Sequence, residues 1–435
     1  MRRRLVTIAL AVTVSLGAGA ALVVAGGALG RTPPAAPDQT AVSSTVDLLD
    51  QSISRSQDRL RRVPGDWETW AALGMSYLER ARISSDPTYY PKAEEAVQRS
   101  LRARTDGNFQ ALIALGALAN ARHDFAAARE QALAAIALNG YSSEAYAVLA
   151  DAQTQLGNPA AATEALQRLL DLQPGLSAYA RASYDLELRG MNTEAADLMR
   201  RALDTAVGRY DIAFCRNQLG DLALATGDLE TARVEYDAGM MADPTSITLQ
   251  RGQARLAAMS GDIDGALAAY ATLTRRSPTP GYLIEYAELL RAAGRESDAE
   301  AQLRLATAAH QLFVANGGTD GLTGSALAMA TGRPADALRE AQAEWEKRQF
   351  VDVADTLSWA LHLSNRDAEA LVFAKRAYES GATSATYAYH LGMIELALGD
   401  RAAAKEHLRR ALQINPRFSP LDAPSARAAL ASLES

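Results

Sequence analysis

The side chains that most often carry out catalysis are few in this chain and widely scattered. The 435 residues include a single cysteine, Cys215, and five histidines: His123, His310, His362, His390 and His407. No two histidines have the spacing of a helical zinc site, and no Gly-x-Ser-x-Gly segment supplies a nucleophile elbow. One cysteine cannot form an intrachain disulfide or a cysteine metal cluster, so we expect Cys215 to be a small core residue. The sequence therefore predicts a protein that is not an enzyme, with no catalytic residue, cofactor or metal site.

One glycine-rich segment could be mistaken for a phosphate-binding loop. It reads NGGTDGLTGS and covers residues 316–325. A phosphate loop needs a preceding strand and a following Gly-Lys-Ser/Thr, and neither is present. We therefore expect a flexible link between structural units, and no small-molecule substrate is implied.

The charge of the chain argues against a nucleic-acid partner. The formal net charge is −7, although the first 31 residues hold four arginines and no acid. Binding to a phosphate backbone depends on a surplus of basic side chains, which the rest of the chain lacks. The acidity is the kind that keeps a protein soluble.

The N-terminus has the pattern of an export signal. A basic tip at residues 1–4 precedes an uncharged apolar stretch at residues 5–30, and a proline-rich linker follows at residues 31–44. As a helix, 26 residues would be about 39 Å long, more than the roughly 30 Å hydrocarbon core. The arginines place the N-terminus in the cytoplasm and the remainder outside it. We expect an uncleaved membrane anchor, with a cleaved signal and a secreted protein as the alternative, because small residues at 17–20 and 26–30 could support cleavage.

The body of the chain repeats one pattern about every 34 residues. A glycine or asparagine suited to positive φ recurs at steps of 33 to 38 residues, at Gly157, Gly190, Gly227, Gly261, Gly294, Gly332, Asn365 and Gly399. Such a period with a turn residue at mid-unit indicates a repeated helix–turn–helix unit.

Two further positions in each unit hold only small residues. Seven residues before each turn, the first predicted helix carries Gly74, Gly116, Ala150, Ser183, Gly220, Ala254, Ala287, Ser325, Ser358 or Gly392. The second predicted helix carries alanine in all ten units, at Ala93, Ala128, Ala162, Ala195, Ala232, Ala266, Ala299, Ala337, Ala370 and Ala404. Small residues at fixed places predict that two helices approach closely there.

Together these positions resemble the tetratricopeptide repeat. The first unit shows its opening residues, Trp70, Leu73, Gly74 and Tyr77, and Pro174, Pro244, Pro278 and Pro416 close later units. The resemblance covers roughly residues 64–416. It implies an all-α, right-handed superhelical solenoid of about ten repeats over residues 45–418, with a capping helix over residues 419–435. The stretch YHLGMIELALGDRAAAKEHLRRALQINPRFSPL is also similar to the C-terminal repeats of exported bacterial proteins of this type.

The resemblance implies that the first helix of each unit lines a concave groove that binds a partner. The residues that fall on this groove are Asn217, Asp221, Arg251, Arg255, Glu285, Glu288, Arg291, Asp355, Trp359, His362, Tyr389, His390 and Met393. Asn217, Arg251 and Arg255 partly match the basic clamp with which some family members hold a C-terminal carboxylate, although the other clamp positions differ. Ion pairing within the chain is the alternative role for the arginines, and core packing is the alternative for Trp359 and Tyr389.

The predicted function is a membrane-anchored scaffold outside the cytoplasm that binds a peptide or protein partner in this groove. The alternative is an accessory or assembly subunit of an envelope enzyme or transporter.

Overall fold

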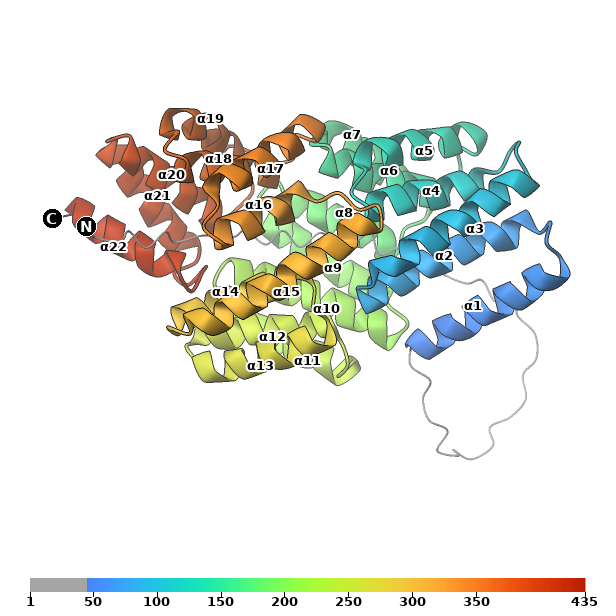
Figure 1. Cartoon of the computed structure of the whole chain (residues 1–435), viewed down its shortest axis with the longest axis horizontal. Helices are drawn as coiled ribbons and strands as arrows, with labels where there is room; N and C mark the ends of the chain where they lie inside the picture. Colours follow the sequence, from blue (N-terminus) through green and yellow to red (C-terminus); the bar gives the residue numbers. More distant parts are fainter. Residues whose placement is uncertain (1–44, 435) are drawn as a thin grey trace.

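The chain folds into helices throughout the part that the structure describes. The computed structural model describes residues 45–434, which contain 22 α-helices, one short 3₁₀ helix and no strand (Figure 1). The all-helical prediction is therefore confirmed for these residues. The predicted tip, the anchor at 5–30 and the linker at 31–44 lie outside them. Within residues 45–434, no helix has both the length and the apolar character needed to cross a membrane.

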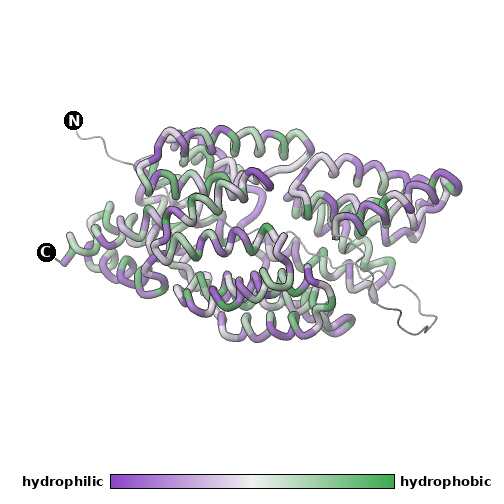
Figure 2. The backbone as a smooth tube through the Cα atoms, turned by 90° about the horizontal axis from the view of Figure 1, so that it is seen from below, coloured by the Kyte–Doolittle hydropathy of each residue, from purple (hydrophilic) through white to green (hydrophobic). Residues whose placement is uncertain are grey.

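The helices form ten consecutive pairs between two single helices, α1 (Thr45–Arg62) and α22 (Asp422–Glu434). The first helices of the pairs are α2 (Trp67–Ser84), α4 (Phe109–Ala121), α6 (Ser143–Gln155), α8 (Leu176–Glu187), α10 (Arg209–Ala225), α12 (Ile247–Ser260), α14 (Pro280–Ala292), α16 (Gly321–Ala330), α18 (Val351–Leu363) and α20 (Ala385–Ala397). The second helices are α3 (Tyr90–Ala103), α5 (Phe125–Leu138), α7 (Pro159–Leu172), α9 (Asn192–Asp204), α11 (Leu229–Ala242), α13 (Ile263–Arg276), α15 (Glu296–Ala315), α17 (Pro334–Lys347), α19 (Asp367–Tyr378) and α21 (Arg401–Ile414). Figure 2 shows hydrophilic and hydrophobic residues mixed along these helices, as expected when each helix buries one face.

The turn inside each pair depends on one residue with left-handed backbone geometry. All eight predicted turn residues have φ between 59° and 95°. Ser85 and His123 take the same role in the first two pairs, with φ of 54° and 62°. In four pairs an aspartate follows at once and caps the next helix, as Asp228 does by accepting a hydrogen bond from the Thr231 amide at 3.0 Å. The turn residue thus ends one helix and the aspartate begins the next.

The small residues lie where the two helices of a pair meet. All ten repeat alanines of the second helices are at most 1% exposed. A Cβ at Gly220 would overlap the buried ring of Tyr236. Two of the three serines at this position form a bond across the pair: Ser183 donates to the Ala195 carbonyl at 2.7 Å and Ser325 to that of Ala337 at 2.9 Å, whereas Ser358 donates to the Asp355 carbonyl of its own helix. The close approach predicted from the sequence is confirmed.

The irregular steps of the repeat are absorbed by longer helices and one insertion. Helix α10 has 17 residues and α15 has 20, which accounts for the two longest steps. The extra residues of the first pair form η1 (Pro87–Tyr89). The expectation of a flexible link over residues 316–325 is wrong for its second half, because Gly321 begins α16 and Asp320 caps that helix through the Thr323 amide. Two glycines do not prevent a helix whose other face is well packed.

Successive turns of the superhelix are bonded to one another. The turn inside each of the first five pairs contacts the end of the pair five units later, through Gly190 and Gly381 for the fourth pair and, for the others, through side-chain bonds at separations of 190 to 197 residues. We call this series of contacts the inter-turn seam. Its hydrogen bonds include Thr319 N–H to the Arg122 carbonyl at 2.8 Å, Gln349 N–H to the Leu156 carbonyl at 3.4 Å, and Asn415 Nδ2 to the Leu224 carbonyl at 2.9 Å. In Figure 1 the orange helices α15 and α17 accordingly lie beside the blue and teal helices of the first turn.

The seam also packs aromatic rings. Phe313, near the C-terminal end of the long helix α15, meets the ring of Tyr90 edge-on at 6.2 Å and lies 5.4 Å from the ring of His123. His123 also stacks on Phe125 at 5.5 Å, and its Nδ1 is 3.9 Å from Asp320 Oδ2. The extra length of α15 therefore serves to reach the first turn of the superhelix.

Candidate functional site

Most first helices of neighbouring pairs contact one another, and we call the side of the superhelix that they line the inner wall. Every predicted groove residue lies on one of these helices, namely α10, α12, α14, α18 or α20. The structure thus gathers the predicted residues on one set of elements. Most of them, however, have partners within the chain.

Asp221 on α10 is the centre of the first polar group. It accepts hydrogen bonds from Asn217 Nδ2 at 2.9 Å and from the Tyr236 hydroxyl at 2.7 Å. The Arg255 guanidinium, one repeat away, donates to the same carboxylate at 3.2 Å. Three donors on two neighbouring repeats therefore fix the position of this carboxylate.

Arg251 and Glu285 form the second group and are both buried. Arg251 Nε donates to Glu285 Oε2 at 2.9 Å and its Nη2 to Oε1, while the Tyr270 hydroxyl donates to the same carboxylate at 3.1 Å. Burial opposes ionisation of Glu285, but the charge and hydrogen bonds of Arg251 hold the pKa of that carboxyl below its ordinary value. Because Arg251 and Arg255 both pair with internal carboxylates, a carboxylate clamp at this place would have to displace those partners.

The aromatic residues of the last two pairs are packed into the core. Trp359 is 2% exposed and Tyr389 1%. The Trp359 ring stacks on His390 at 4.2 Å and lies 4.7 Å from His362. His390 Nδ1 is 2.8 Å from Asp355 Oδ1. The described contacts of Trp359 and Tyr389 are those of core residues between repeats.

The remaining predicted residues lie nearer the surface of the inner wall. Arg291 donates to the Ala330 carbonyl at 2.8 Å and to Glu296 at 3.0 Å. His362 Nδ1 is 2.5 Å from Asp367 Oδ1. Met393 is partly buried against the C-terminal core. These side chains, with Arg255, are the more exposed of the predicted groove residues.

Several buried polar atoms of the inner wall have no hydrogen-bond partner. Four of them belong to the C-terminal pairs and the capping helix: Glu288 Oε1, Trp359 Nε1, His390 Nε2 and Asp422 Oδ1. We call Glu288, Asp355, Trp359, His390 and Asp422 the C-terminal inner cluster. The sequence did not reveal Asp422, because an acid at the start of a capping helix has the pattern of an ordinary helix cap.

Burial raises the pKa of two carboxyls in this cluster. The pKa of Glu288 is well above its ordinary value because of burial, with the nearby Asp422 and Glu285 carboxyls adding to the shift. Burial also raises the pKa of Asp422 to about 6, although the Ser419 hydroxyl and His390 oppose the shift. Both results follow from carboxyls that are out of water and lack a basic partner.

Two more acids of the inner wall behave in the same way. Burial raises the pKa of Glu187 on α8 to about 7, and the Asp221 and Asp352 carboxyls increase the shift. Burial raises that of Asp352 on α18 to about 6, against a hydrogen bond from the Tyr387 hydroxyl. Glu187 comes from the first turn of the superhelix and Asp352 from the second. Acidic side chains from both turns therefore face one interior.

A metal site and a reactive thiol are the other candidates for chemistry within residues 45–434. In residues 45–434, no three histidine, cysteine or acidic side chains are placed to hold a metal ion. Cys215 is fully buried, and burial raises the pKa of its thiol to about 12, so it is a poor nucleophile.

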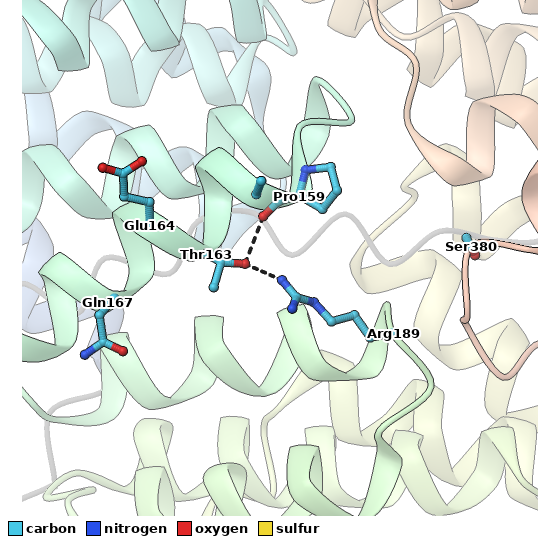
Figure 3. Close-up of a pocket in the computed structure, with 7 residues that line it drawn as sticks. Pro159, Thr163, Glu164, Gln167, Arg189 and Ser380 are labelled. Carbon is cyan, nitrogen blue, oxygen red and sulfur yellow. Dashed lines mark hydrogen bonds between the residues drawn. The ribbon is translucent and has the colours of Figure 1, made fainter.

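One wide pocket lies at the seam rather than on the inner wall. It has a volume of about 790 Å³ and lies between α7, Arg189 and Ser380 (Figure 3). In Figure 3, Thr163 links the Arg189 guanidinium to the Pro159 carbonyl, while Glu164 and Gln167 point away from Ser380. This open surface has few convergent polar groups.

The family is identified by two of the ten pairs. Residues 143–175 (α6 and α7) and residues 385–418 (α20 and α21) match the family model of the tetratricopeptide repeat. The chain therefore contains tetratricopeptide repeats, as predicted, and such repeats suggest a protein-interaction scaffold.

Solved structures and curated proteins were also compared with the chain. It is similar to a tetratricopeptide repeat protein from Parabacteroides merdae, with 17% identity over 60% of this chain and 99% of the other, at a TM-score of 0.36. It is also similar to the Cut9–Hcn1 hetero-tetramer of the APC/C, with 15% identity over 90% of this chain and 97% of the other, at a TM-score of 0.41. No curated protein matches the sequence.

Proposed function

We propose that this protein is a non-enzymatic interaction scaffold that binds an extended peptide or protein partner along the inner wall of its superhelix. We further propose that residues 5–30 anchor it in a membrane and that its repeats lie outside the cytoplasm. The proposal for location is supported by the arginines at 2–4 followed by 26 uncharged residues.

One observation carries the proposal for binding. Ten consecutive helix pairs place most of their first helices in contact, so that charged residues from distant parts of the chain line one wall. An array of this kind provides a long concave surface and a rigid scaffold for it. Together with the tetratricopeptide repeats, this surface supports recognition of a partner rather than catalysis.

The test is in-cell crosslinking and affinity purification of the full chain beside two variants. The inner-wall variant is Arg255→Ala with Met393→Ala, because both side chains are only partly buried. The matched control is Val234→Ala with Val372→Ala, which are 48% and 64% exposed on second helices. We expect one dominant partner that is lost in the first variant and retained in the second. Equal recovery from both variants would place binding elsewhere.

The alternative function is an accessory or assembly subunit of an envelope enzyme or transporter. Such a subunit would co-purify with its complex at a constant ratio, whereas a scaffold would bring down clients at variable ratios. A reporter enzyme that folds only outside the cytoplasm, fused after Ser435, tests the location. Activity of this fusion is expected, and an inactive but expressed fusion would contradict the proposed orientation.

A further inference from the structure

The inner wall has more buried carboxyls than bases to pair with them. Glu187, Asp352, Glu288 and Asp422 take part in none of the ion pairs found among residues 45–434, whereas the inner-wall arginines Arg251 and Arg255 are fully used by other acids. A buried carboxyl without a basic partner costs free energy, and such groups are retained at sites that hold a ligand more often than elsewhere.

Two of these carboxyls without a basic partner belong to the C-terminal inner cluster. Glu288 is 9% exposed and Asp422 is completely buried, yet Glu288 Oε1 and Asp422 Oδ1 accept no hydrogen bond. Glu288 comes from α14 in the seventh pair and Asp422 from the capping helix, so the superhelix itself brings them near each other. Two buried carboxyl oxygens without a donor, in groups that form no ion pair, describe a site that a cation would complete.

The neighbouring side chains do not supply that cation. His390 uses Nδ1 for Asp355 and leaves Nε2 without a partner, and Trp359 Nε1 is likewise free. Arg291, one helical turn after Glu288, donates instead to Glu296 and to the Ala330 carbonyl. Among residues 45–434, no base therefore forms an ion pair with Glu288 or Asp422, although Arg291 and His390 oppose the rise in their pKa values.

The acidic wall continues beyond the cluster. Asp352 lies one turn before Asp355 on α18, and Glu187 approaches Asp352 from the first turn of the superhelix. The acids therefore form a strip along the interior instead of a single point. Acids arranged in a strip would match a bound peptide that carries several positive charges at intervals.

We propose that the inner wall binds a peptide segment rich in lysine or arginine, and that Glu288, with Asp422 behind it, holds one of its cationic side chains. This inference rests on the proposed function, which it makes more specific by naming the charge of the partner. Glu288 is the more exposed of the two carboxyls, so the cation reaches the pair past Glu288. An ammonium or guanidinium group would donate to Glu288 Oε1 and would favour the ionised form of that carboxyl in a site with low dielectric.

The test uses the purified full chain and a phage library of random 12-residue peptides. The variant is Glu288→Gln, which keeps the shape of the side chain and removes its charge. The matched control is Glu300→Gln, which removes the same charge from an exposed position on α15. We expect selected peptides to be enriched in lysine and arginine, and their affinity to fall by at least about tenfold in Glu288→Gln but not in Glu300→Gln.

A thermal melt of the same variants separates binding from folding. Because Glu288 is a buried carboxyl without a partner, Glu288→Gln should melt at the same temperature as the wild type or higher. Lower affinity with undiminished stability is a result that a purely structural role for Glu288 would not give.

Two other outcomes are informative in different ways. Peptides that bind without a preference for basic residues, or that bind Glu288→Gln and Glu300→Gln equally well, would overturn this inference and leave the scaffold function intact. If the full chain selects no peptide and captures no partner in cells, both the inference and the proposed function fail.

Discussion

Asn415 allows the inter-turn seam to be tested with a matched control. Its side chain is 2% exposed, and Nδ2 donates to the Leu224 carbonyl at 2.9 Å and more weakly to that of Ala225 at 3.4 Å, across 191 residues. Its Oδ1 accepts a local bond from the Arg417 amide at 2.9 Å. Asn139 ends α5 with the same extended backbone and the same local bond, to the Tyr141 amide at 3.1 Å, but its Nδ2 reaches no other turn.

The difference between Asn415→Ala and Asn139→Ala therefore isolates the bonds of the seam. Removing the buried bonds of Asn415 should cost about 1–2 kcal/mol, since the Leu224 carbonyl keeps its bond from the Gly227 amide. This free energy corresponds to an increase of about 5- to 30-fold in local opening.

Hydrogen exchange with mass spectrometry measures that opening separately in each segment. In Asn415→Ala we expect faster exchange both around Asn415 and in the turn around Leu224. In Asn139→Ala only the segment around Asn139 should change. If Asn415→Ala leaves the Leu224 turn as protected as in the wild type, the seam contributes no stability and the reasoning is refuted.

Three further predictions concern the core and the buried acids. Gly220→Ala should lower the free energy of unfolding by about 1–3 kcal/mol in urea titrations, because its Cβ would overlap the Tyr236 ring. The control Gly65→Ala, which has open space around it, should change this free energy by less than about 0.5 kcal/mol. Equal effects of the two substitutions would contradict the packing argument. Folding raises the pKa of Asp422 from 3.8 to about 6 and so favours the protonated form, which means that stability falls as the pH rises through this range. Asp422→Asn should lose that part of the pH dependence of the urea midpoint, and an unchanged profile would show that Asp422 is not the group responsible. Cys215 should react with a thiol reagent at pH 8 only after urea unfolds the chain, and rapid labelling of the folded protein would contradict its burial.

The repeat could be predicted from the sequence because its requirements are local. A turn residue must accept positive φ, and the residue where two helices touch must be small, so both leave a mark at a fixed spacing. Ser85 escaped notice as a turn residue because serine rarely has positive φ. His123 was missed although histidine accepts this geometry and His123 falls seven positions after Gly116, like the glycines of later units. The seam left no such mark, since it joins residues about 190 apart and depends on how the superhelix rises.

The inner wall was predicted less completely than the helices. Spacing identified the face on which Arg251, Arg255 and Asp355 lie but not their partners. A signal was present nonetheless, because Arg251 and Glu285 are 34 residues apart and so are Asp221 and Arg255, which is one repeat. Opposite charges at the repeat period therefore indicate ion pairs between neighbouring first helices. Glu187 and Asp422 have no such partner in sequence, and only the closure of the superhelix brings them to the interior.

The seam has a consequence for folding during synthesis on the ribosome. In an ordinary helical array each repeat contacts only its neighbours, so a repeat can complete its structure soon after it leaves the ribosome. Here the turn around Leu224 acquires its last bond only when Asn415 has been made, 191 residues later. At a synthesis rate of about 5–20 residues per second, that delay is roughly 10–40 s. During this interval the seam groups of the early repeats lack their later partners. The nascent chain must therefore avoid pairing these groups with another copy of the protein.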